Sequence, residues 1–374
     1  MKTPRTIIHK TGLTLMLIAT TQATTAQTQN VTVLEYHPAP GQFVNTMPEA
    51  TNETTQEEIL ARCTEALREG SLVHLGAFGG YITVEFDHPI QNLRGSDIRI
   101  RGNATYAVNN DKAIGGSIEP GIVYVGVGDS PETASWYELA GSEYYTSEIH
   151  DFKITYHKPT AETGAHQRPN SIYDNYIKWE ATWTADGVRR DSSGYNMKNT
   201  FHQQSYWPQW QGENNETLTF SGGKLPNNAI DQSGNGSYWV LYRYTTDSYG
   251  YVDASLSNED ASTFDIDWAV DNNGNHISLN QIDYIRITSS LLQECGWIGE
   301  TSTEVSGIED LHLIAGYDDN PIIITPRTPT AAGSTKLHAT HHDIQEVYYD
   351  LTGRKILHPQ QGIYINHGKK IIVR

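Results

Sequence analysis

The chain has 374 residues, with 26 Lys and Arg against 44 Asp and Glu, and a formal net charge of −18 at pH 7. This acidic excess disfavours nucleic acid and anionic membrane surfaces as partners, because phosphate binding requires a basic patch. Only 19% of the residues are charged, so the composition is that of a folded protein rather than of a disordered acidic tail. A chain of this length can form one large or two medium domains.

Residues 1–26 have the pattern of an export signal. Basic residues precede the apolar run Leu13–Ala19, and small residues follow, with a cleavage site predicted after Ala26. The run is too short to span a bilayer, and no other stretch is long enough, so membrane insertion is not expected. Cys63 and Cys295 both lie in the exported part, where a disulfide is permitted. Two separate buried thiols are the alternative.

Residues 55–69 predict one short N-terminal helix. Thr55 and Glu58 are spaced as a capping box, and Gly70 stands where a helix would end. Between them, apolar residues recur at helical spacing; they are Ile59, Cys63, Ala66 and Leu67. We interpret this helix as structural.

From residue 72 onward, polar and apolar residues alternate with a period of two, which predicts strands with one buried face. The strands predicted in this way are Tyr81–Phe86 and Asp97–Arg101, and Phe152–Tyr156 and Ile172–Trp183 continue the series. Gly121–Val127 is apolar almost throughout and predicts an inner strand. Short strands separated by Gly and Asn turns, without helices between them, predict a jelly-roll-like β-sandwich rather than a parallel sheet. One elaborated sandwich over residues 31–315 is preferred to two, because no linker-like break occurs before residue 316.

Residues 184–236 are rich in Gly, Asn, Ser and Gln and predict irregular structure, in which Ser205–Trp210 forms an aromatic cluster on a loop. Ser237–Tyr244 then resumes the sheet. Phe264–Val270 alternates strictly and predicts a strand. The next segments predict a tight turn and a second strand that completes a hairpin; they are Asp271–Asn275 and Ile277–Ile287.

The end of the chain differs in composition from the body. Residues 316–336 are rich in Pro and Thr and predict a linker, and residues 337–374 predict a small basic β unit. The segments VYYDLTGRKI, GIYI and GKKIIV resemble the C-terminal sorting domain of type IX secretion in Bacteroidota. This resemblance implies passage through the outer-membrane secretion machinery, followed by display on, or release from, the cell surface.

The body resembles a family of Bacteroidota cell-surface proteins. The segments that carry the resemblance are LEYHPAPGQFVNTMP, GGYITVEFDHPIQN, EPGIVYVGV, WYELAGSEY and GETSTEVSGIEDLHL. Members are associated with vitamin B12 uptake regions, which implies corrinoid capture at the surface. Relatives often carry an acidic, Asn- and Gly-rich loop just before WYELAGSEY, of a kind that can hold calcium; here residues 128–135 read GDSPETAS, with fewer ligands.

Two groups of residues are candidate metal ligands. Asp265, Asp267 and Asp271 are expected on the solvent face of one strand, about 6.5 Å apart for residues two positions apart. They predict a solvated face, a calcium site or, less consistently with their shared direction, a glycosidase acid pair. A second group stands near the linker and is either a transition-metal site or an accidental cluster; it consists of His338, His341 and His342.

No hydrolase elbow, zinc-protease helix or phosphate-binding loop is present, so no catalytic residue and no resident cofactor is assigned. Aromatic residues beside polar, Gly-rich segments are the candidate ligand-binding residues; they are Trp136, Tyr137, Tyr206, Trp207, Trp210 and Trp239. The sequence therefore predicts a non-catalytic ligand-binding protein for a corrinoid or a glycan. A glycoside-active enzyme and a structural or adhesive module are the alternatives.

Overall fold

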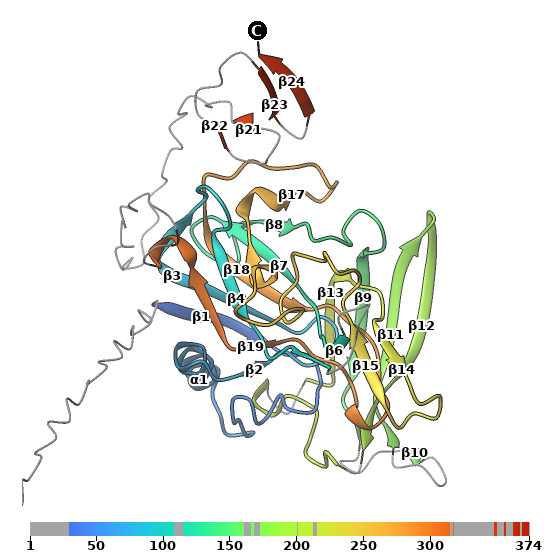
Figure 1. The fold of residues 1–374 in the computed structure, drawn as a ribbon. Coiled ribbons are helices and arrows are strands. Elements are labelled where there is room, and N and C mark those ends of the chain that lie inside the picture. Colours follow the sequence, from blue (N-terminus) through green and yellow to red (C-terminus); the bar gives the residue numbers. More distant parts are fainter. Residues whose placement is uncertain are drawn as a thin grey trace, which may run out of the picture.

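The computed structural model describes most of the body of the chain and four short strands near its C-terminus (Figure 1). The described residues are 30–107, 115–160, 166–167, 173–199, 201–211, 215–314, 317, 348–349, 355–356, 362–366 and 369–373. The predicted export signal and the histidines at 338, 341 and 342 lie outside them, as does nearly all of the predicted linker. Within the described part, no helix is long and apolar enough to cross a membrane.

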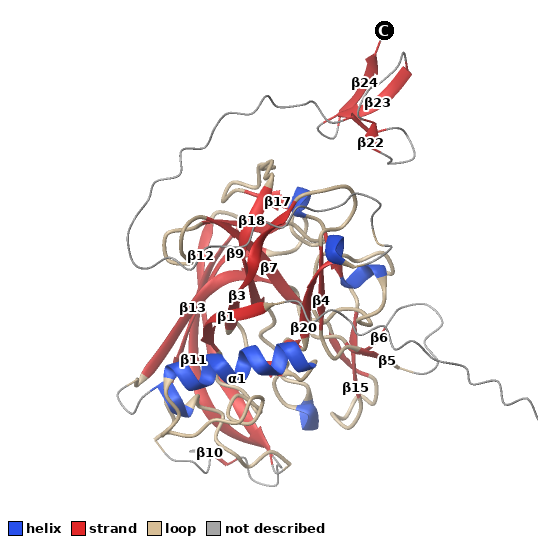
Figure 2. Ribbon diagram, turned by 90° about the vertical axis from the view of Figure 1, so that its left-hand side faces the viewer, coloured by secondary structure: helices blue, strands red, loops and turns tan. Residues whose placement is uncertain are grey.

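The predicted helix is confirmed as α1, Gln56–Glu69. The Thr55 hydroxyl accepts a hydrogen bond from the Glu58 amide at 3.2 Å, and the Glu58 carboxylate accepts one from the Thr55 amide at 2.8 Å. The helix ends at Gly70, whose φ of 77° is left-handed and therefore favours glycine. The buried face of α1 packs against strand β1, Val31–His37 (Figure 2).

The largest sheet has six strands, and each strand is antiparallel to its neighbours. Its order is β1, β3 (Tyr81–Gln91), β18 (Gln281–Ser289), β7 (Gly121–Val127), β8 (Ser135–Leu139) and β17 (Ala269–Val270). The predicted inner position of Gly121–Val127 is confirmed, because β7 lies between β18 and β8.

A five-stranded sheet contains much of the region that was expected to be irregular. Its strands are β10 (His166–Gln167), β11 (Tyr173–Ala185), β9 (Ile149–His157) and β13 (Thr217–Lys224), with β12 (Val188–Asn199) paired to β11. Residues 184–236 are thus not irregular throughout. Polar side chains obscured β12 and β13, because strands with an exposed face tolerate Ser, Asn and Thr there.

Smaller sheets complete the described structure. One consists of β14 (Ala229–Asp231), β15 (Trp239–Tyr242), β6 (Gly115–Ser117) and β5 (Thr105–Tyr106). Another consists of β16 (Thr263–Phe264), β4 (Ile98–Arg101) and β20 (Gly307–Asp310), and β19 (Glu304–Val305) pairs with β2 (Val73–His74). The C-terminal strands β22 (Lys355–Ile356), β21 (Tyr348–Tyr349), β23 (Gly362–Asn366) and β24 (Lys369–Val373) form a sheet of their own.

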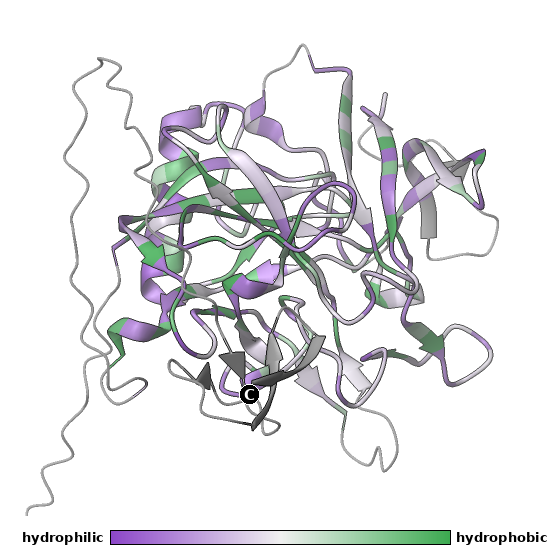
Figure 3. Ribbon diagram, turned by 90° about the horizontal axis from the view of Figure 1, so that it is seen from above, coloured by the Kyte–Doolittle hydropathy of each residue, from purple (hydrophilic) through white to green (hydrophobic). Residues whose placement is uncertain are grey.

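The prediction of a jelly-roll-like sandwich is wrong, although the mainly β class is right. The sheets are arranged as a four-bladed β-propeller rather than as two stacked layers. Accordingly, the buried hydrophobic residues of the described chain form three large clusters instead of one core between two layers. Hydrophobic stretches follow the strands in the middle of the body (Figure 3). Alternation identifies the buried face of a strand but not the sheet that covers it.

The predicted hairpin over Phe264–Ile287 is confirmed only beside its turn, where Val270 pairs antiparallel with His276, and is wrong for the rest of both strands. Phe264 ends the short strand β16, a 3₁₀ turn occupies Ile266–Trp268, and Ala269 begins β17. Strand β18 pairs with β3 and β7 rather than with this segment. The turn itself is confirmed, because Asp271 and Asn275 are joined by a backbone hydrogen bond of 2.9 Å.

The two cysteines are free and buried, in two different clusters. Cys63 lies on α1 in the largest cluster, and Cys295 lies in the cluster beside β15. The alternative of two separate buried thiols therefore holds.

Candidate ligand-binding cleft

A cleft of about 600 Å³ lies between the six-stranded and five-stranded sheets. One wall is the polar face of β3, β7, β8 and β18, and the other comes from β9 and β13. The turn after β17 and the loop before β9 form its rim. The residues that line it are Gly79, Tyr81, Tyr124, Trp136, Glu138, Tyr144, His150, Asp151, Thr219, Phe220, Ser221, Gly222, Val270, Asp271, Asn272, Arg286 and Thr288.

The wall on the six-stranded sheet follows directly from strand register. Thr83 pairs with Arg286, Arg286 with Tyr124, and Tyr124 with Glu138, so four polar side chains stand in one row across four strands. Their neighbours in sequence point to the opposite face; Ile82, Val84, Val123, Val125, Ile285 and Ile287 lie in the largest hydrophobic cluster. The cleft is therefore the polar side of a sheet whose other side is core.

Arg286 organises the centre of this wall. Its Nη2 donates to the Glu35 carboxylate at 2.6 Å, and its Nε donates to the Thr83 hydroxyl at 2.9 Å. The guanidinium also lies 4.1 Å from the ring centroid of Trp136 and 4.8 Å from that of Tyr81. Cation–π contacts contribute about 0.5–2 kcal/mol each, depending on desolvation. Arg286 is thus held in place by an ion pair and by two aromatic rings.

A carboxylate pair with a histidine lies at one end of the cleft. Donor atoms of Glu138, Glu148 and His150 all lie within 4.8 Å of one another. Glu138 is only 9% exposed, and the Glu148 side chain is fully buried. Burial and the adjacent Glu148 carboxylate raise the pKa of Glu138 well above its ordinary value. The contact with Glu148 raises the pKa of His150, whose Nδ1 lies 3.2 Å from Glu148 Oε1.

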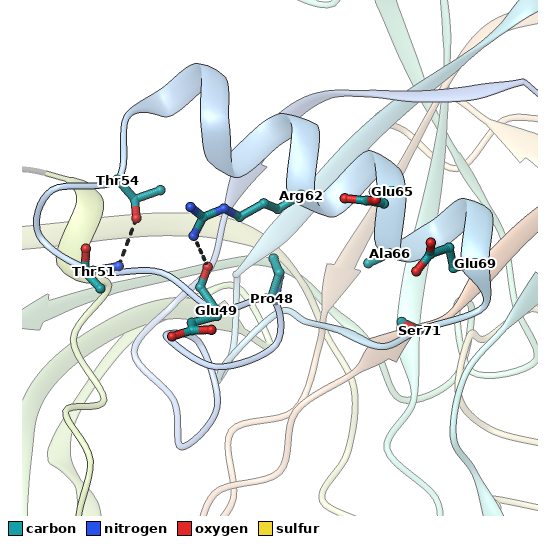
Figure 4. Close-up of a pocket in the computed structure, with 9 residues that line it drawn as sticks. All are labelled: Pro48, Glu49, Thr51, Thr54, Arg62, Glu65, Ala66, Glu69 and Ser71. Atoms are coloured by element: carbon teal, nitrogen blue, oxygen red, sulfur yellow. Dashed lines mark hydrogen bonds between the residues drawn. The ribbon is translucent and has the colours of Figure 1, made fainter.

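A second hollow, of about 470 Å³, lies between α1 and the loop that precedes it (Figure 4). Arg62 donates to the Glu49 carbonyl at 2.6 Å, and the Thr51 amide donates to the Thr54 hydroxyl at 3.0 Å. No aromatic ring among the described residues lines it. The charged residues along its wall are all exposed; they are Glu49, Arg62, Glu65 and Glu69. Exposed charges and backbone turns of this kind hold no ligand on their own, so the cleft between the sheets is the better candidate.

Only one of the six predicted aromatic residues lines the cleft. Trp136 faces it, whereas Tyr137, the next residue of β8, points the other way and packs against the core. Trp239 packs against the cluster beside β15, and its Nε1 donates to the Gly236 carbonyl at 3.2 Å. The other three, Tyr206, Trp207 and Trp210, lie in the loop segment that connects β12 and β13, as expected.

That loop does not form an exposed platform, and the structure corrects this part of the prediction. Tyr206, Trp207 and Trp210 are 0%, 3% and 7% exposed. Trp210 stacks on Tyr36 with centroids 5.5 Å apart, and Tyr206 meets Tyr176 edge to face at 5.4 Å. The long aromatic loop is packed into the body, because covering so much apolar ring area stabilises the fold.

The three predicted acidic ligands do not share one face of one strand. Asp265 caps the 3₁₀ turn and accepts from the Asp267 amide at 2.8 Å. Asp267 accepts from the Asn92 side chain at 2.8 Å, and Asp271 accepts from the amides of the turn that it begins. Within the described chain, none of the three belongs to a cluster with metal-ligand spacing. The carboxylates of Asp265 and Asp271 serve as local caps, which is the role that Asp favours at turns, whereas Asp267 joins its turn to Asn92, just after β3.

Possible metal-binding clusters do occur among the described residues, but elsewhere. Besides the cluster in the cleft, Glu119, Asp253 and Glu304 bring their carboxylates within 4.8 Å of one another. Here Asp253 accepts from the amides of Asn103 and Ala104 at 2.8 and 2.7 Å. This second cluster joins segments that are far apart in the sequence, whereas the three residues of the cluster in the cleft lie within thirteen positions of one another.

Arg286, Tyr124 and Glu138 were not predicted from the sequence as residues of a site. A signal was present, because Arg286 and Tyr124 are polar residues inside apolar strand patterns, YIRI and GIVYVGV. A charged side chain on an inner strand needs an oppositely charged partner. For Arg286 this partner is Glu35, which lies on β1.

Comparison with known proteins adds no family to these observations: no family model matches the chain, and no curated protein matches it.

Proposed function

We propose that the body of this protein is a non-catalytic binding module for an uncharged, polyhydroxylated ligand, a carbohydrate, held in the cleft between the six-stranded and five-stranded sheets. The observation that carries the proposal is the combination, in one open cavity, of Trp136 and Tyr81 with the fixed guanidinium of Arg286. Aromatic surface beside a few oriented polar groups is the usual composition of a small-molecule site.

The charges along the cleft favour a neutral ligand over an anionic one. The positive charge of Arg286 is matched by Glu35 at 2.6 Å, and further acidic groups line the cavity, among them Asp151 and Asp271. Sugar hydroxyls both donate and accept hydrogen bonds, so they suit carboxylates, tyrosine hydroxyls and a guanidinium together. A corrinoid, which the family resemblance implies, is the competing ligand in the test below.

Isothermal titration of the full chain with a panel of neutral oligosaccharides and with cyanocobalamin tests the proposal. We expect at least one oligosaccharide to bind and Trp136→Ala to weaken its binding at least tenfold, about 1.4 kcal/mol. Trp239→Ala is the matched control, because Trp239 is also half-buried but lies outside the cleft; its affinity should be unchanged.

Binding of cyanocobalamin alone would replace the carbohydrate with a corrinoid. The cleft would be rejected as the binding site if neither ligand class gave a heat of binding. Equal losses of affinity in the Trp136→Ala and Trp239→Ala variants would also reject it.

We also propose that the protein is exported and displayed on, or released from, the cell surface. The pattern of residues 1–26 and the resemblance of the C-terminal segments to a sorting domain support this. Deletion of residues 337–374 should leave the protein inside the outer membrane, and cell fractionation with an antibody against the body measures this. Release of the shortened chain in unchanged amounts would contradict the role of this segment.

A further inference from the structure

The donor atoms of Glu138, Glu148 and His150 come from two sheets that approach each other at the end of the cleft. Glu138 lies on β8, whereas Glu148 immediately precedes β9 and His150 lies near the start of that strand. Glu148 Oε1 and His150 Nδ1 are 3.2 Å apart. Two ligands bound tetrahedrally to one ion at about 2.0–2.1 Å are separated by about 3.3 Å. This pair therefore already has the spacing of neighbouring metal ligands.

One oxygen of each carboxylate in the cluster is buried without a hydrogen-bond partner, although Glu138 also has a side-chain hydrogen bond with Tyr124. Within the described residues, no donor reaches Glu138 Oε1 or Glu148 Oε2. Glu138 is 9% exposed and the Glu148 side chain is fully buried, so water solvates neither of them well. Two adjacent buried carboxylates require a proton or a cation between them.

The surrounding backbone holds Glu148 in this position. A Cβ atom at Gly223 of β13 would lie 2.1 Å from Glu148 Oε1, so the strand can pass over the carboxylate only because residue 223 has no side chain. On the other side, the ring of Tyr144 packs 4.3 Å from that of His150, whose side chain is 48% exposed. Ligands that are positioned before binding lose less entropy when the ion arrives.

We propose that Glu138, Glu148 and His150 bind one divalent transition-metal ion, zinc or manganese, at the end of the cleft. Two carboxylate oxygens and one imidazole nitrogen suit these ions, whereas calcium prefers oxygen ligands alone. Three protein ligands leave further coordination positions, and Glu138 and His150 both line the cavity. A bound ion would therefore face the cleft. This site goes beyond the proposed carbohydrate binding and does not depend on it.

The other acidic cluster supplies an internal comparison. Its Glu304 contacts His74 at 3.2 Å, Glu119 accepts from the Ser302 amide at 3.3 Å, and Asp253 accepts from three backbone amides. Most of its oxygens thus have donors within the fold, which is the arrangement of a structural network rather than of an open metal site.

The test is titration of the EDTA-treated full chain with zinc, manganese and calcium chloride, with the bound metal counted by elemental analysis. All variants carry alanine at the predicted exposed histidines, because these can bind zinc themselves; they are His338, His341 and His342. In this background we expect one equivalent of zinc or manganese to bind at least tenfold more tightly than calcium.

Glu138→Gln and His150→Gln should each weaken that binding at least tenfold. The matched controls Glu304→Gln and His157→Gln should leave it unchanged, because His157 lies on the same strand but outside the cluster. Thermal melting of each variant shows that it is folded. No stoichiometric binding, tighter binding of calcium, or equal losses in the controls would overturn the assignment. Because no sugar is present, the outcome is separate from that of the carbohydrate titration.

Discussion

The guanidinium of Arg286 lies 4.1 Å from the ring centroid of Trp136, although 150 positions separate the two residues in sequence. Strand β7 stands between their strands, so the contact crosses one strand of the sheet. It links the charge that is paired with Glu35 to the aromatic surface of the cleft, so Arg286 both stabilises the sheet and lines the cleft.

Arg286→Lys should therefore destabilise the fold by about 1–2 kcal/mol, because an ammonium replaces neither the planar stack nor the two directed hydrogen bonds. Urea unfolding measures the change. Arg101→Lys is the control: the Arg101 side chain is 44% exposed and also pairs with a carboxylate, Glu309, at 2.6 Å. An exposed pair contributes at most about 1 kcal/mol, so a larger loss at Arg101 than at Arg286 would contradict the assigned role.

Trp210→Ala should lower the free energy of unfolding by about 3–5 kcal/mol, the usual cost of removing a buried tryptophan. Its ring is 7% exposed and stacks on Tyr36. Trp297→Ala should cost less than about 1 kcal/mol, because Trp297 is 47% exposed. Comparable losses in urea unfolding would show that the aromatic loop is not packed as described, and would restore it as a candidate binding surface.

The buried cluster of Glu119, Asp253 and Glu304 should make the free energy of unfolding fall as pH rises. Burial raises the pKa of Glu119 from 4.5 to about 8, and it raises that of Asp253 from 3.8 to about 6. Between pH 4.5 and 8 the folded protein thus binds more protons than the unfolded chain, so raising the pH favours unfolding. Glu119→Gln removes one of the titrating carboxyl groups. Between pH 4.5 and 8, the variant should therefore lose less unfolding free energy than the unchanged protein, and the difference should be at least about 1.4 kcal/mol. Identical pH profiles from urea unfolding would contradict this.

Gly223→Ala should disturb the cluster in the cleft, because the added methyl group would lie 2.1 Å from Glu148 Oε1 and 2.6 Å from Ile122 Cδ1. We expect a drop in melting temperature and at least a tenfold loss of zinc affinity. Gly222→Ala is the adjacent control, since its methyl group would approach nothing closer than the Tyr124 hydroxyl at 3.6 Å. Equal effects at both positions would indicate a general intolerance of β13 rather than contact with Glu148.

Local features were readable from the sequence because their physical causes are local. The helix over 56–69 follows from the Thr55–Glu58 box and Gly70, and the turn at Asp271 follows from side chains that bond their own backbone. Several strands follow from alternation alone. Phe264–Val270 also alternates, yet its capping Asp265 favours a 3₁₀ turn, so periodicity was outweighed by a local hydrogen bond.

The arrangement of the sheets, and with it the cleft, was decided by tertiary structure. Alternation showed that Tyr81 and Ile82 face opposite sides of their strand, but a strand pattern contains no information about which strand lies beside it. Pairing β18 with both β3 and β7 aligned Thr83, Arg286 and Tyr124. Packing β9 and β13 over that row then brought Glu148 and His150 to Glu138. The sequence by itself determined the buried side of the strands in which polar and apolar residues alternate clearly, such as Tyr81–Phe86, because apolar side chains are driven into the core. The residues that meet in the cleft depend on long-range pairing, which only the folded chain decides.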